Sequence, residues 1–527
     1  MGSFMCITLA TLLLGAHSVL GVPTPETISA CAEIENALPG KVLTRGLLAV
    51  KYAYETQQYW STTLRYVDPA CIVQPVDAVD VSVVIKTLNK YPTVNFATRS
   101  GGHDPNVGHA TIQDGVLITM TDLTGATYDA KENVAYVKPG GEWNDVIGDL
   151  EKSGVAISGG RLGEDTLALL SYIILTNSSA GLVGVGGLLL GGGISFLSAQ
   201  EGLAADNIIG WETVMANGSI INVDAAARPD LAQAMRGSGG QFGVVTQFKV
   251  KVHPIGDVWG GFCIYDQSQE KKLYAALHNF VGHGAEDPKA AIIFSDLVFA
   301  AGIKAKLIFY FYDGPERPAS GPFADFFNGI NLTCLPQKQK YSSLLRANGE
   351  PVRLLNARAF FRTYTVPYIA SRPQMYAEIR DKLANITTYF LNSPGFVRAT
   401  QFSVDFQPLP SVIGKISQSK GGNAMGLTAS DPDRIILMFQ GAWNFAEDDA
   451  LAYGLARQLT DWLDVVVPQW ISEAGLPQDL YLPFFMNDGM GDQAITQSYR
   501  DYEKFKALQE SVDPNGLFST RAGGFKY

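Results

Sequence analysis

The sequence has no run of basic residues, no internal repeat, no low-complexity tract and no heptad pattern. Its 40 Lys and Arg are outnumbered by 51 Asp and Glu, which gives a formal net charge of −11. An acidic chain without a basic patch has no electrostatic footprint for nucleic acid, so we expect no nucleic-acid partner. The composition, 46% hydrophobic and 17% charged, is that of a globular chain, and 527 residues predict two large domains or more.

A long membrane-spanning run is also missing. The apolar stretch at 5–14 is too short to cross a bilayer. Small residues follow it, and the string V-L-G at 19–21 is a plausible cleavage site, although no Lys or Arg precedes the run. We therefore predict a signal peptide over 1–21, a secreted protein, and no membrane attachment after cleavage.

Cysteine is scarce, with five in the chain, and Cys6 would leave with the signal peptide. The other four form an even set, which in an exported chain predicts two disulfides. We expect Cys31–Cys71 and Cys263–Cys334, because each pair falls inside one predicted domain. Four N-x-S/T sequons predict a glycoprotein on the same secretory route. They begin at Asn177, Asn217, Asn331 and Asn385.

Hydrophobic periodicity predicts an α+β protein. Residues 22–66 are expected to be helical, 67–255 to alternate short strands with helices, and 256–475 to form a second α+β domain. Residues 476–527 are expected to return to the first domain. The expected helices are 81–88, 376–391, 447–466 and one within 499–518, which ends in D-P-N-G at 513–516, a turn or helix-stop signal. The expected strands are 93–98, 116–119, 134–137, 243–252, 290–294 and 304–312.

Glycine is abundant, and three clusters of it lie at 99–103, 184–193 and 236–243. Glycines let backbone N–H groups approach a ligand closely, and successive N–H groups form a concavity suited to a pyrophosphate. Three such loops can jointly wrap a dinucleotide, although each alone is equally compatible with a tight turn. A Walker A lysine and a G-x-G-x-x-G opening a helix are both missing, which disfavours a Rossmann fold and indicates a different cradle.

Several strings resemble one flavoprotein family. R-S-G-G-H at 99–103 resembles the FAD-attachment loop of the berberine bridge enzyme-like group, in the vanillyl alcohol oxidase superfamily with its PCMH-type FAD-binding fold. The string at 184–193 resembles the second flavin loop, and G-L-A-A-D-N-I at 202–208 resembles the segment beside the cofactor. The string from 236 to 250 resembles the loop and strand that close the FAD domain, and V-D-P-N-G-L-F at 512–518 resembles the C-terminal signature.

The resemblance implies an FAD-linked oxidoreductase with an FAD-binding domain at 67–255 and a substrate-binding domain at 256–475, whose antiparallel sheet is covered by helices. A neutral imidazole nitrogen of His103 would bond to the 8α-methyl carbon of the isoalloxazine, and backbone N–H groups of 99–102 would face the pyrophosphate. No metal is expected. The residues implied to contact FAD are Arg99, Ser100, Gly101, Gly102, His103, Val183, Gly184, Val185, Gly186, Gly187, Gly193, Asp206, Asn207, Ile208, Gly243, Val245 and Asn487.

The sequence departs from the family pattern in two places near the flavin. Some relatives carry a second tether, a Cys just before G-V-G-G, but no cysteine lies near Gly184 here, so His103 is expected to be the single covalent link. Moreover, 18 extra residues at 164–181 separate G-G-R-L-G at 159–163 from the second flavin loop. An active-site lid and a retained intron in the gene model are the two hypotheses for this stretch.

Flavin-dependent oxidation needs a C–H bond aimed at flavin N5 and often a base for an adjacent O–H or N–H. That base is expected from the second domain. The candidate bases are Tyr364, Tyr368, Asp405 and Tyr481, and the candidates for orienting substrate are Gln407 and Asn423. Sugar-oxidising relatives carry Tyr-x-Asn near the C-terminus, where this chain has Phe485-Met486-Asn487, so a carbohydrate oxidase is the disfavoured alternative.

Val183 stands where relatives control oxygen access, and its small side chain favours an oxidase that converts O2 to H2O2. The expected reaction is oxidation of a small organic molecule, of the secondary-metabolite kind, by hydride transfer to N5. An alternative from another class is a secreted flavin-binding protein without turnover, which the stretch at 164–181 would produce by blocking the ring.

Peptide mass spectrometry on the native protein distinguishes the two hypotheses for 164–181. If the stretch is a retained intron, no peptide from the native protein contains residues 172–175. Detection of such a peptide would exclude the intron and leave the lid.

Overall fold

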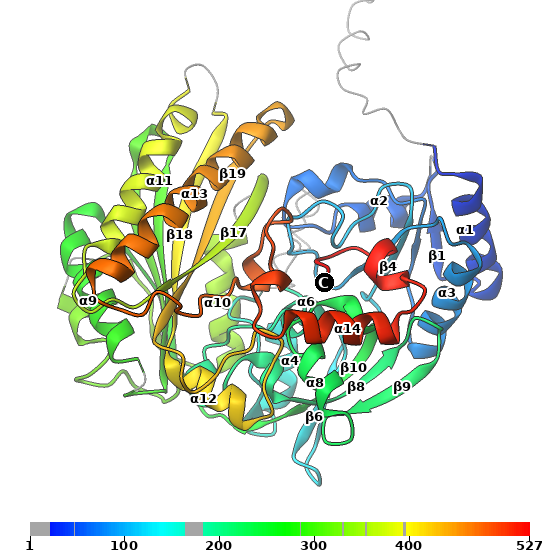
Figure 1. Cartoon of the computed structure of the whole chain (residues 1–527), viewed down its shortest axis with the longest axis horizontal. Coiled ribbons are helices and arrows are strands. Elements are labelled where there is room, and N and C mark those ends of the chain that lie inside the picture. The colour runs from blue at the N-terminus through cyan, green and yellow to red at the C-terminus, as the bar shows by residue number, and fades with distance from the viewer. Residues whose placement is uncertain are drawn as a thin grey trace, which may run out of the picture.

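The computed structural model describes residues 22–46, 48–163, 183–284, 286–328, 331–353, 356–393 and 397–527. The expected signal peptide and the stretch at 164–181 lie outside these described residues. No helix within them has the length and apolar character needed to cross a membrane. Three large sheets and the helices that cover them form a two-domain α+β fold, as the sequence predicts (Figure 1).

The first sheet has four strands in the order β1-β2-β4-β3, with β1 antiparallel to β2 and the other neighbours parallel. Its strands are β1 (Val42–Thr44), β2 (Cys71–Val73), β3 (Phe96–Arg99) and β4 (Val116–Thr119). Helices α1 (Pro25–Ala37) and α3 (Ala78–Lys90) pack on it through apolar residues at helical spacing, such as Val81 and Ile85. Helix α2 (Val50–Thr56) follows β1.

The second sheet has five antiparallel strands in the order β5-β6-β10-β8-β9. They are β5 (Ala126–Asp129), β6 (Val134–Val137), β8 (Ile208–Val214), β9 (Ile220–Asp224) and β10 (Val244–Lys251). The helices of this region are α4 (Trp143–Glu151), α6 (Val185–Leu190), α7 (Ser198–Glu201) and α8 (Pro229–Met235). A small ladder joins β7 (Val155–Ala156) to β11 (His253–Pro254), next to the expected domain boundary.

The third sheet is antiparallel, with the order β15-β12-β14-β13-β18-β19-β17 and β16 paired to β12. Its strands are β12 (Val258–Asp266), β13 (Ala290–Phe299), β14 (Lys304–Tyr312), β15 (Asn331–Cys334), β16 (Gln337–Gln339), β17 (Arg358–Pro367), β18 (Ala399–Leu409) and β19 (Arg434–Trp443). Helices α10 (Tyr341–Arg353) and α12 (Ser411–Ser419) lie in the same part of the chain.

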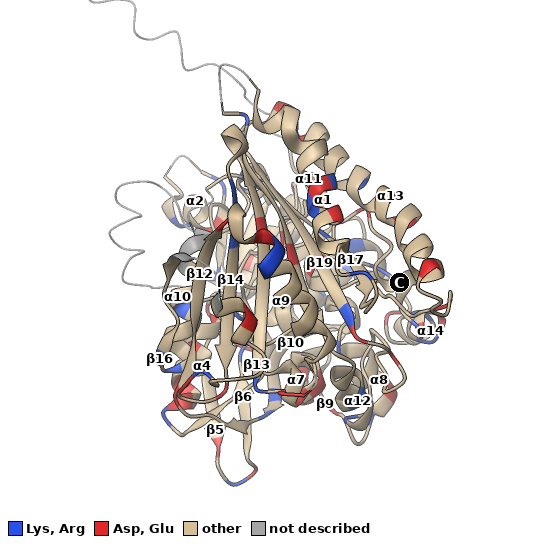
Figure 2. Ribbon diagram, turned by 90° about the vertical axis from the view of Figure 1, so that its left-hand side faces the viewer, with Lys and Arg blue, Asp and Glu red and all other residues tan. Residues whose placement is uncertain are grey.

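Three helices cover one face of the third sheet: α9 (Glu270–Gly282), α11 (Met375–Leu391) and α13 (Asp449–Glu473). Figure 2 looks onto this side, where α9 lies over the strands and basic residues are interspersed with acidic ones. The opposite face of the sheet is turned towards the first two sheets (Figure 1). The strands therefore present alternate side chains to a helix-packed core and to the interior between the sheets.

Both expected disulfides are present. Cys31–Cys71 ties α1 to β2, and Cys263–Cys334 links directly opposed residues of β12 and β15. The helical expectation for 22–66 is wrong in one respect, because β1 adds an edge strand to the first sheet. Three residues are too few to show a period of two, so pairing with β2 decides the conformation.

The C-terminal segment returns to the first two sheets, where α14 (Tyr502–Val512) crosses in front of them (Figure 1). The helix ends at Val512, directly before the D-P-N-G string at 513–516 that is expected to stop it. The Asp513 carboxylate accepts N–H bonds from Leu517, Phe518 and Ser519 at 2.8, 2.8 and 3.0 Å. This side chain is 3% exposed, so it satisfies three backbone donors that water does not reach.

Replacing Asp513 with Ala should lower the free energy of unfolding by about 3 kcal/mol, because three N–H groups lose a charged acceptor. Thermal unfolding followed by circular dichroism measures the change. Glu510→Ala is the matched control, since Glu510 is exposed on the same helix. Equal melting temperatures for the two variants would contradict this role of Asp513.

Candidate active site

A cavity of about 690 Å³ lies where the three sheets meet, a size typical of cofactor and ligand pockets. Its lining at one end comes from the first two sheets and includes Phe96, Met120, Val244 and Phe518. The glycine loops line its middle. The third sheet lines the other end with Ile264, Ile293, Leu307 and Phe309, among others. The cavity thus connects an apolar slot, a glycine cradle and a sheet face.

Eleven of the seventeen residues predicted to contact FAD line this cavity. They are Ser100, Gly101, Gly102, His103, Val183, Gly184, Gly186, Gly187, Gly243, Val245 and Asn487. The strings that resembled flavin loops therefore converge on one space, although they are up to about four hundred residues apart in the chain.

The first two glycine loops touch through their backbones. A Cβ on Gly184 would lie 2.2 Å from the Gly101 nitrogen, which no side chain permits. Ser100 joins the same contact, because its hydroxyl donates to the Pro139 carbonyl and accepts the Gly186 N–H at 3.2 Å. Gly102 adopts φ +78° and packs against Gln58, so only glycine fits there.

The cavity side of these loops is open. A Cβ on Gly187 or Gly240 would meet no protein atom within 4 Å, and both glycines line the cavity. Asn487 holds this edge: its amide donates to the carbonyls of Gly187 and Leu188 at 3.1 and 3.3 Å, and its oxygen accepts the Gly193 N–H at 2.9 Å. Bare backbone facing an elongated space fits a dinucleotide such as FAD.

Six of the predicted FAD contacts do not line the cavity, and each has a packing role instead. They are Arg99, Val185, Gly193, Asp206, Asn207 and Ile208. The fully buried Arg99 side chain pairs with Glu55 beneath the first loop. Asp206 accepts hydrogen bonds from Ser417 and, at 2.8 Å, from Asn423, so it joins the second sheet region to α12 and the loop after it.

Strand β18 presents a polar strip to the cavity, formed by every second residue. The strip consists of Gln401, Ser403, Asp405 and Gln407. Neighbouring strands add Ser295 from β13, Met438 and Gln440 from β19, and Phe361 from β17. Of the predicted catalytic residues, only Asp405 lies here, together with Gln407 as a candidate for orienting substrate.

The tyrosines proposed as bases lie elsewhere. Tyr364 is on β17 but points to the helix-covered face, where its hydroxyl donates to Asp464 at 2.9 Å. Tyr481 donates to the Met425 carbonyl at 2.5 Å, outside the cavity lining. Neither tyrosine is placed to take a proton from a molecule in the cavity, and Tyr368, like Asn423, is also outside its lining.

Two carboxyl groups face the cavity from within the protein. Burial and, to a smaller extent, the charge of Asp488 raise the pKa of Asp405 to about 7, against the opposing effects of a Ser295 hydrogen bond and of Arg161. Burial likewise raises the pKa of Asp488 to about 6. Among the described residues no partner reaches Asp405 Oδ1, although the side chain is only 7% exposed. A buried acceptor without a partner, in the lining of a cavity, marks Asp405 as a candidate functional residue.

Arg161 and Asp488 are joined through Gln407. The Arg161 guanidinium donates to the Gln407 amide oxygen, and the Gln407 amide donates to Asp488 Oδ2 at 2.6 Å. These two hydrogen bonds fix the orientation of the Gln407 amide, with its oxygen towards Arg161 and its nitrogen towards Asp488. Sequence reasoning did not single out Arg161 or Asp488, although Arg161 stands in the quoted G-G-R-L-G string and Asp488 directly follows Asn487.

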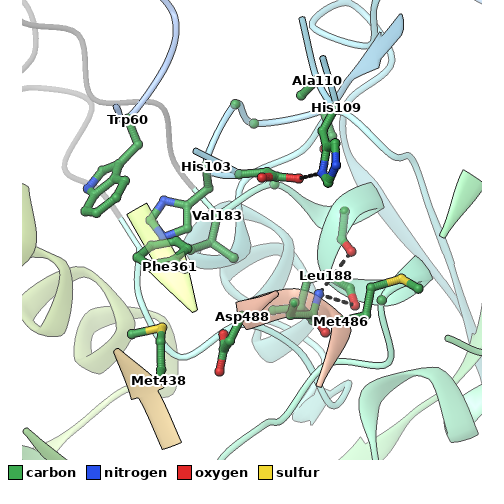
Figure 3. Close-up of a pocket in the computed structure, with 18 of the residues that line it drawn as sticks. Trp60, His103, His109, Ala110, Val183, Leu188, Phe361, Met438, Met486 and Asp488 are labelled. Atoms are coloured by element: carbon green, nitrogen blue, oxygen red, sulfur yellow. Dashed lines mark hydrogen bonds and ion pairs between the residues drawn. The ribbon is translucent and has the colours of Figure 1, made fainter. Parts of the chain in front are cut away.

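Figure 3 shows His103 with Val183 beside it and Trp60 and Phe361 close by. The imidazole centroid is 5.1 Å from the Trp60 ring and 5.5 Å from the Phe361 ring. The Asp104 carboxylate, next to it in the chain, accepts a hydrogen bond from His109 Nδ1 at 2.8 Å. Trp60 and Phe361 were not predicted, because their proximity to His103 depends on tertiary contacts alone.

Comparison with known proteins gives a consistent result. A family model described as an FAD binding domain matches residues 69–224. An uncharacterized FAD-linked oxidoreductase of Arthroderma benhamiae is 33% identical, with 90% of each chain covered. An FAD-dependent monooxygenase, drtC, of Aspergillus calidoustus is 31% identical over 99% of this chain and 95% of that protein.

The berberine bridge enzyme of Eschscholzia californica has the same fold: its structure matches with a TM-score of 0.69 and 15% identity, over 95% of this chain and 99% of that one. The fold, the FAD-binding domain match and the full-length relatives agree with one another. The chain belongs to the FAD-linked oxidoreductases, and it is an FAD-dependent oxidoreductase whose fold is the PCMH-type FAD-binding fold of the berberine bridge enzyme.

Proposed function

We propose that this oxidoreductase is an oxidase that holds FAD through a single covalent bond to His103 and oxidises a small, largely apolar organic molecule, of the secondary-metabolite kind, bearing an ionisable O–H or N–H group. One observation carries the substrate assignment: Asp405 lines the cavity and has a buried Oδ1 with no partner among the described residues, on a sheet whose other contributions are largely apolar.

The covalent link is supported by the position of His103 at the cavity wall, directly after the backbone-to-backbone contact of the glycine loops. A second link through cysteine has no candidate among the described residues, because Cys31, Cys71, Cys263 and Cys334 are all paired in disulfides. The FAD would thus depend on His103 alone for covalent retention, which suits the dilute extracellular setting that we propose for a secreted chain with a signal peptide at 1–21.

FAD, when bound, supplies the acceptor for a hydride from the substrate and passes the electrons to O2, giving H2O2. Asp405 would accept the proton of the substrate O–H or N–H as the adjacent C–H bond is broken. A carboxyl pKa near 7 suits this task, because an appreciable fraction is ionised at neutral pH and the group remains a competent base.

Arg161 and Asp488, which Gln407 links by hydrogen bonds, are two charged groups that act on the Asp405 carboxyl. Arg161 places a positive charge among the two acids, which favours their ionised forms. Asp488 acts in the opposite sense on Asp405, because like charges disfavour ionisation of both. Burial is the main cause of the raised pKa of the proposed base, and this guanidinium and this carboxylate adjust it in opposite directions.

The walls around these polar groups favour an apolar substrate. Ile293, Leu297, Leu307, Phe309 and Met438 line this end of the cavity, and such surfaces bind hydrocarbon rather than a hydroxyl-rich sugar. Phe485 has no proton to exchange where sugar-oxidising relatives carry a tyrosine. A carbohydrate oxidase remains the alternative, and a flavin-binding protein without turnover is the alternative from another class.

A substrate screen that follows H2O2 release tests the reaction type. We expect one H2O2 for each substrate oxidised, because Val183 beside Gly184 leaves room for O2. Transfer of an oxygen atom from 18O2 to the product, without H2O2, would instead support a monooxygenase, the name carried by drtC. Activity on oligosaccharides alone would favour the carbohydrate alternative.

The domain assignment is also part of this proposal: FAD-binding parts at 22–66 and 67–255, a substrate domain at 256–475, and a C-terminal segment at 476–527 that completes the first. It is supported by the three sheets and by the return of α14 to the first two.

A methyl group at Gly187 should obstruct FAD without disturbing the fold, because it would point into the open cavity. In a His103→Ala background, where FAD binds reversibly, Gly187→Ala should raise the Kd for FAD by about 5–150-fold, the equivalent of about 1–3 kcal/mol of overpacking. Fluorescence titration measures it. Gly256→Ala is the control, since Gly256 is also open but lies outside the cavity. Unchanged FAD binding by Gly187→Ala would place the cofactor elsewhere.

Activity should depend on ionisation of Asp405. Because its pKa is raised to about 7, the base is protonated below that pH, so kcat/KM should rise about tenfold per pH unit up to pH 7 and then level. Asp405→Asn should lower kcat by about 100-fold or more. Asp488→Asn removes the like charge that raises the Asp405 pKa, so the rising limb should move to lower pH. An unchanged pH profile in Asp405→Asn would assign the base to another group.

A further inference from the structure

We propose that Trp60 and Phe361 are positioning residues for flavin attachment: the two rings hold the His103 imidazole in the orientation that forms its bond to FAD, and so couple attachment to the docking of the third sheet. This inference rests on the covalent link in the proposed function and goes beyond it, because it assigns the control of that link to an N-terminal segment and a strand of the substrate domain.

The three rings form a compact triangle. Trp60 and Phe361 stack with centroids 4.7 Å apart and planes at 27°, and both lie at 41–44° to the imidazole. Both side chains are 4% exposed, so they have little room to move. Figure 3 shows both side chains close to that of His103. An imidazole packed against two immobile rings loses most of its rotational freedom about χ1 and χ2.

Backbone contacts fix Trp60 to the flavin loop and to the third sheet at once. The Trp60 N–H donates to the Gly102 carbonyl at 3.0 Å, one residue before His103. The next two residues bind β17: Ser61 Oγ accepts the Ala359 N–H at 2.9 Å, and the Thr62 N–H donates to the Ala357 carbonyl at 2.9 Å.

Strand β17 is an edge strand of the third sheet, so its outer backbone groups would otherwise lack partners. Residues 60–62 cover that edge, and Phe361 lies two residues further along the same strand. Residues 60–62 therefore connect the glycine loop at 99–103 to the third sheet. If the sheet were not docked, Phe361 would be absent and Trp60 would lose the contacts that hold it.

Orientation matters because of the chemistry of attachment. A His103 nitrogen forms a bond to the 8α carbon, one C–H bond of the methyl group and the imidazole N–H bond break, and both hydrogens and one electron pair end on the ring system. The ring system is thereby reduced by two electrons, which O2 takes up as H2O2. The protein contributes the placement of the nitrogen, and a displacement of about 1 Å can slow such a step about 100-fold.

Full-length protein incubated with added FAD in air tests the proposal. Acid precipitation at intervals separates covalent from released flavin, and intact mass confirms the adduct. We expect wild type to attach FAD, Trp60→Leu and Phe361→Leu to attach it at least about tenfold more slowly while still binding it reversibly, and Trp60→Phe to recover most of the wild-type rate.

Trp259→Leu is the matched control, because it removes a tryptophan from an aromatic cluster around Phe323 that does not line the cavity. It should attach FAD at the wild-type rate. If Trp60→Leu does not fold, Phe361→Leu decides. Attachment at the wild-type rate in both leucine variants would show that Trp60 and Phe361 do not position His103. It would not contradict the proposed covalent link through His103. Absence of covalent flavin from the wild-type protein would overturn both the positioning role and the covalent link through His103.

Discussion

The site depends on one steric constraint: two loops must meet without side chains between them. Gly184 and Gly101 approach so closely that a Cβ has no room, and Ser100 completes the contact through its hydroxyl. This approach sets the thickness of the wall between the core and the cavity, and it aims the next side chains, His103 and Val183, at the same space. Residues with larger side chains would separate the loops and open the cradle.

The period of two in the third sheet separates structural from chemical side chains. On β18, Phe402, Val404 and Phe406 pack under the helices, whereas the intervening Ser403 and Asp405 face the cavity. A carboxylate held out of water and left partly unpaired costs stability. The helix-covered apolar face of the same strand offsets that cost, so the reactive group can stay poorly solvated until a ligand arrives.

The sequence was informative where the pattern is local. Strands β4, β6 and β14 have the predicted bounds, because continuous or alternating apolar runs mark them. The clusters of glycine in the sequence likewise predicted the loops that line the cavity. Tyr364 shows what is not local: it has suitable chemistry and lies on a strand that borders the site, but on the wrong face. Without knowing the register of β17, its proton-accepting role could not be judged. Trp60 and Asp488 were invisible for a related reason, since their neighbours are supplied by distant parts of the chain.

The wall formed by residues 522–525 has a consequence for biosynthesis. These residues line the cavity together with glycine loops that precede them by about 280 to 420 residues in the chain. During translation, the nascent chain can fold its first sheet and expose the glycine loops, but the chamber stays open on one side until residue 525 has left the ribosome. A complete cofactor cavity therefore requires that residues 522–525 have been synthesised and have folded back onto the first two sheets.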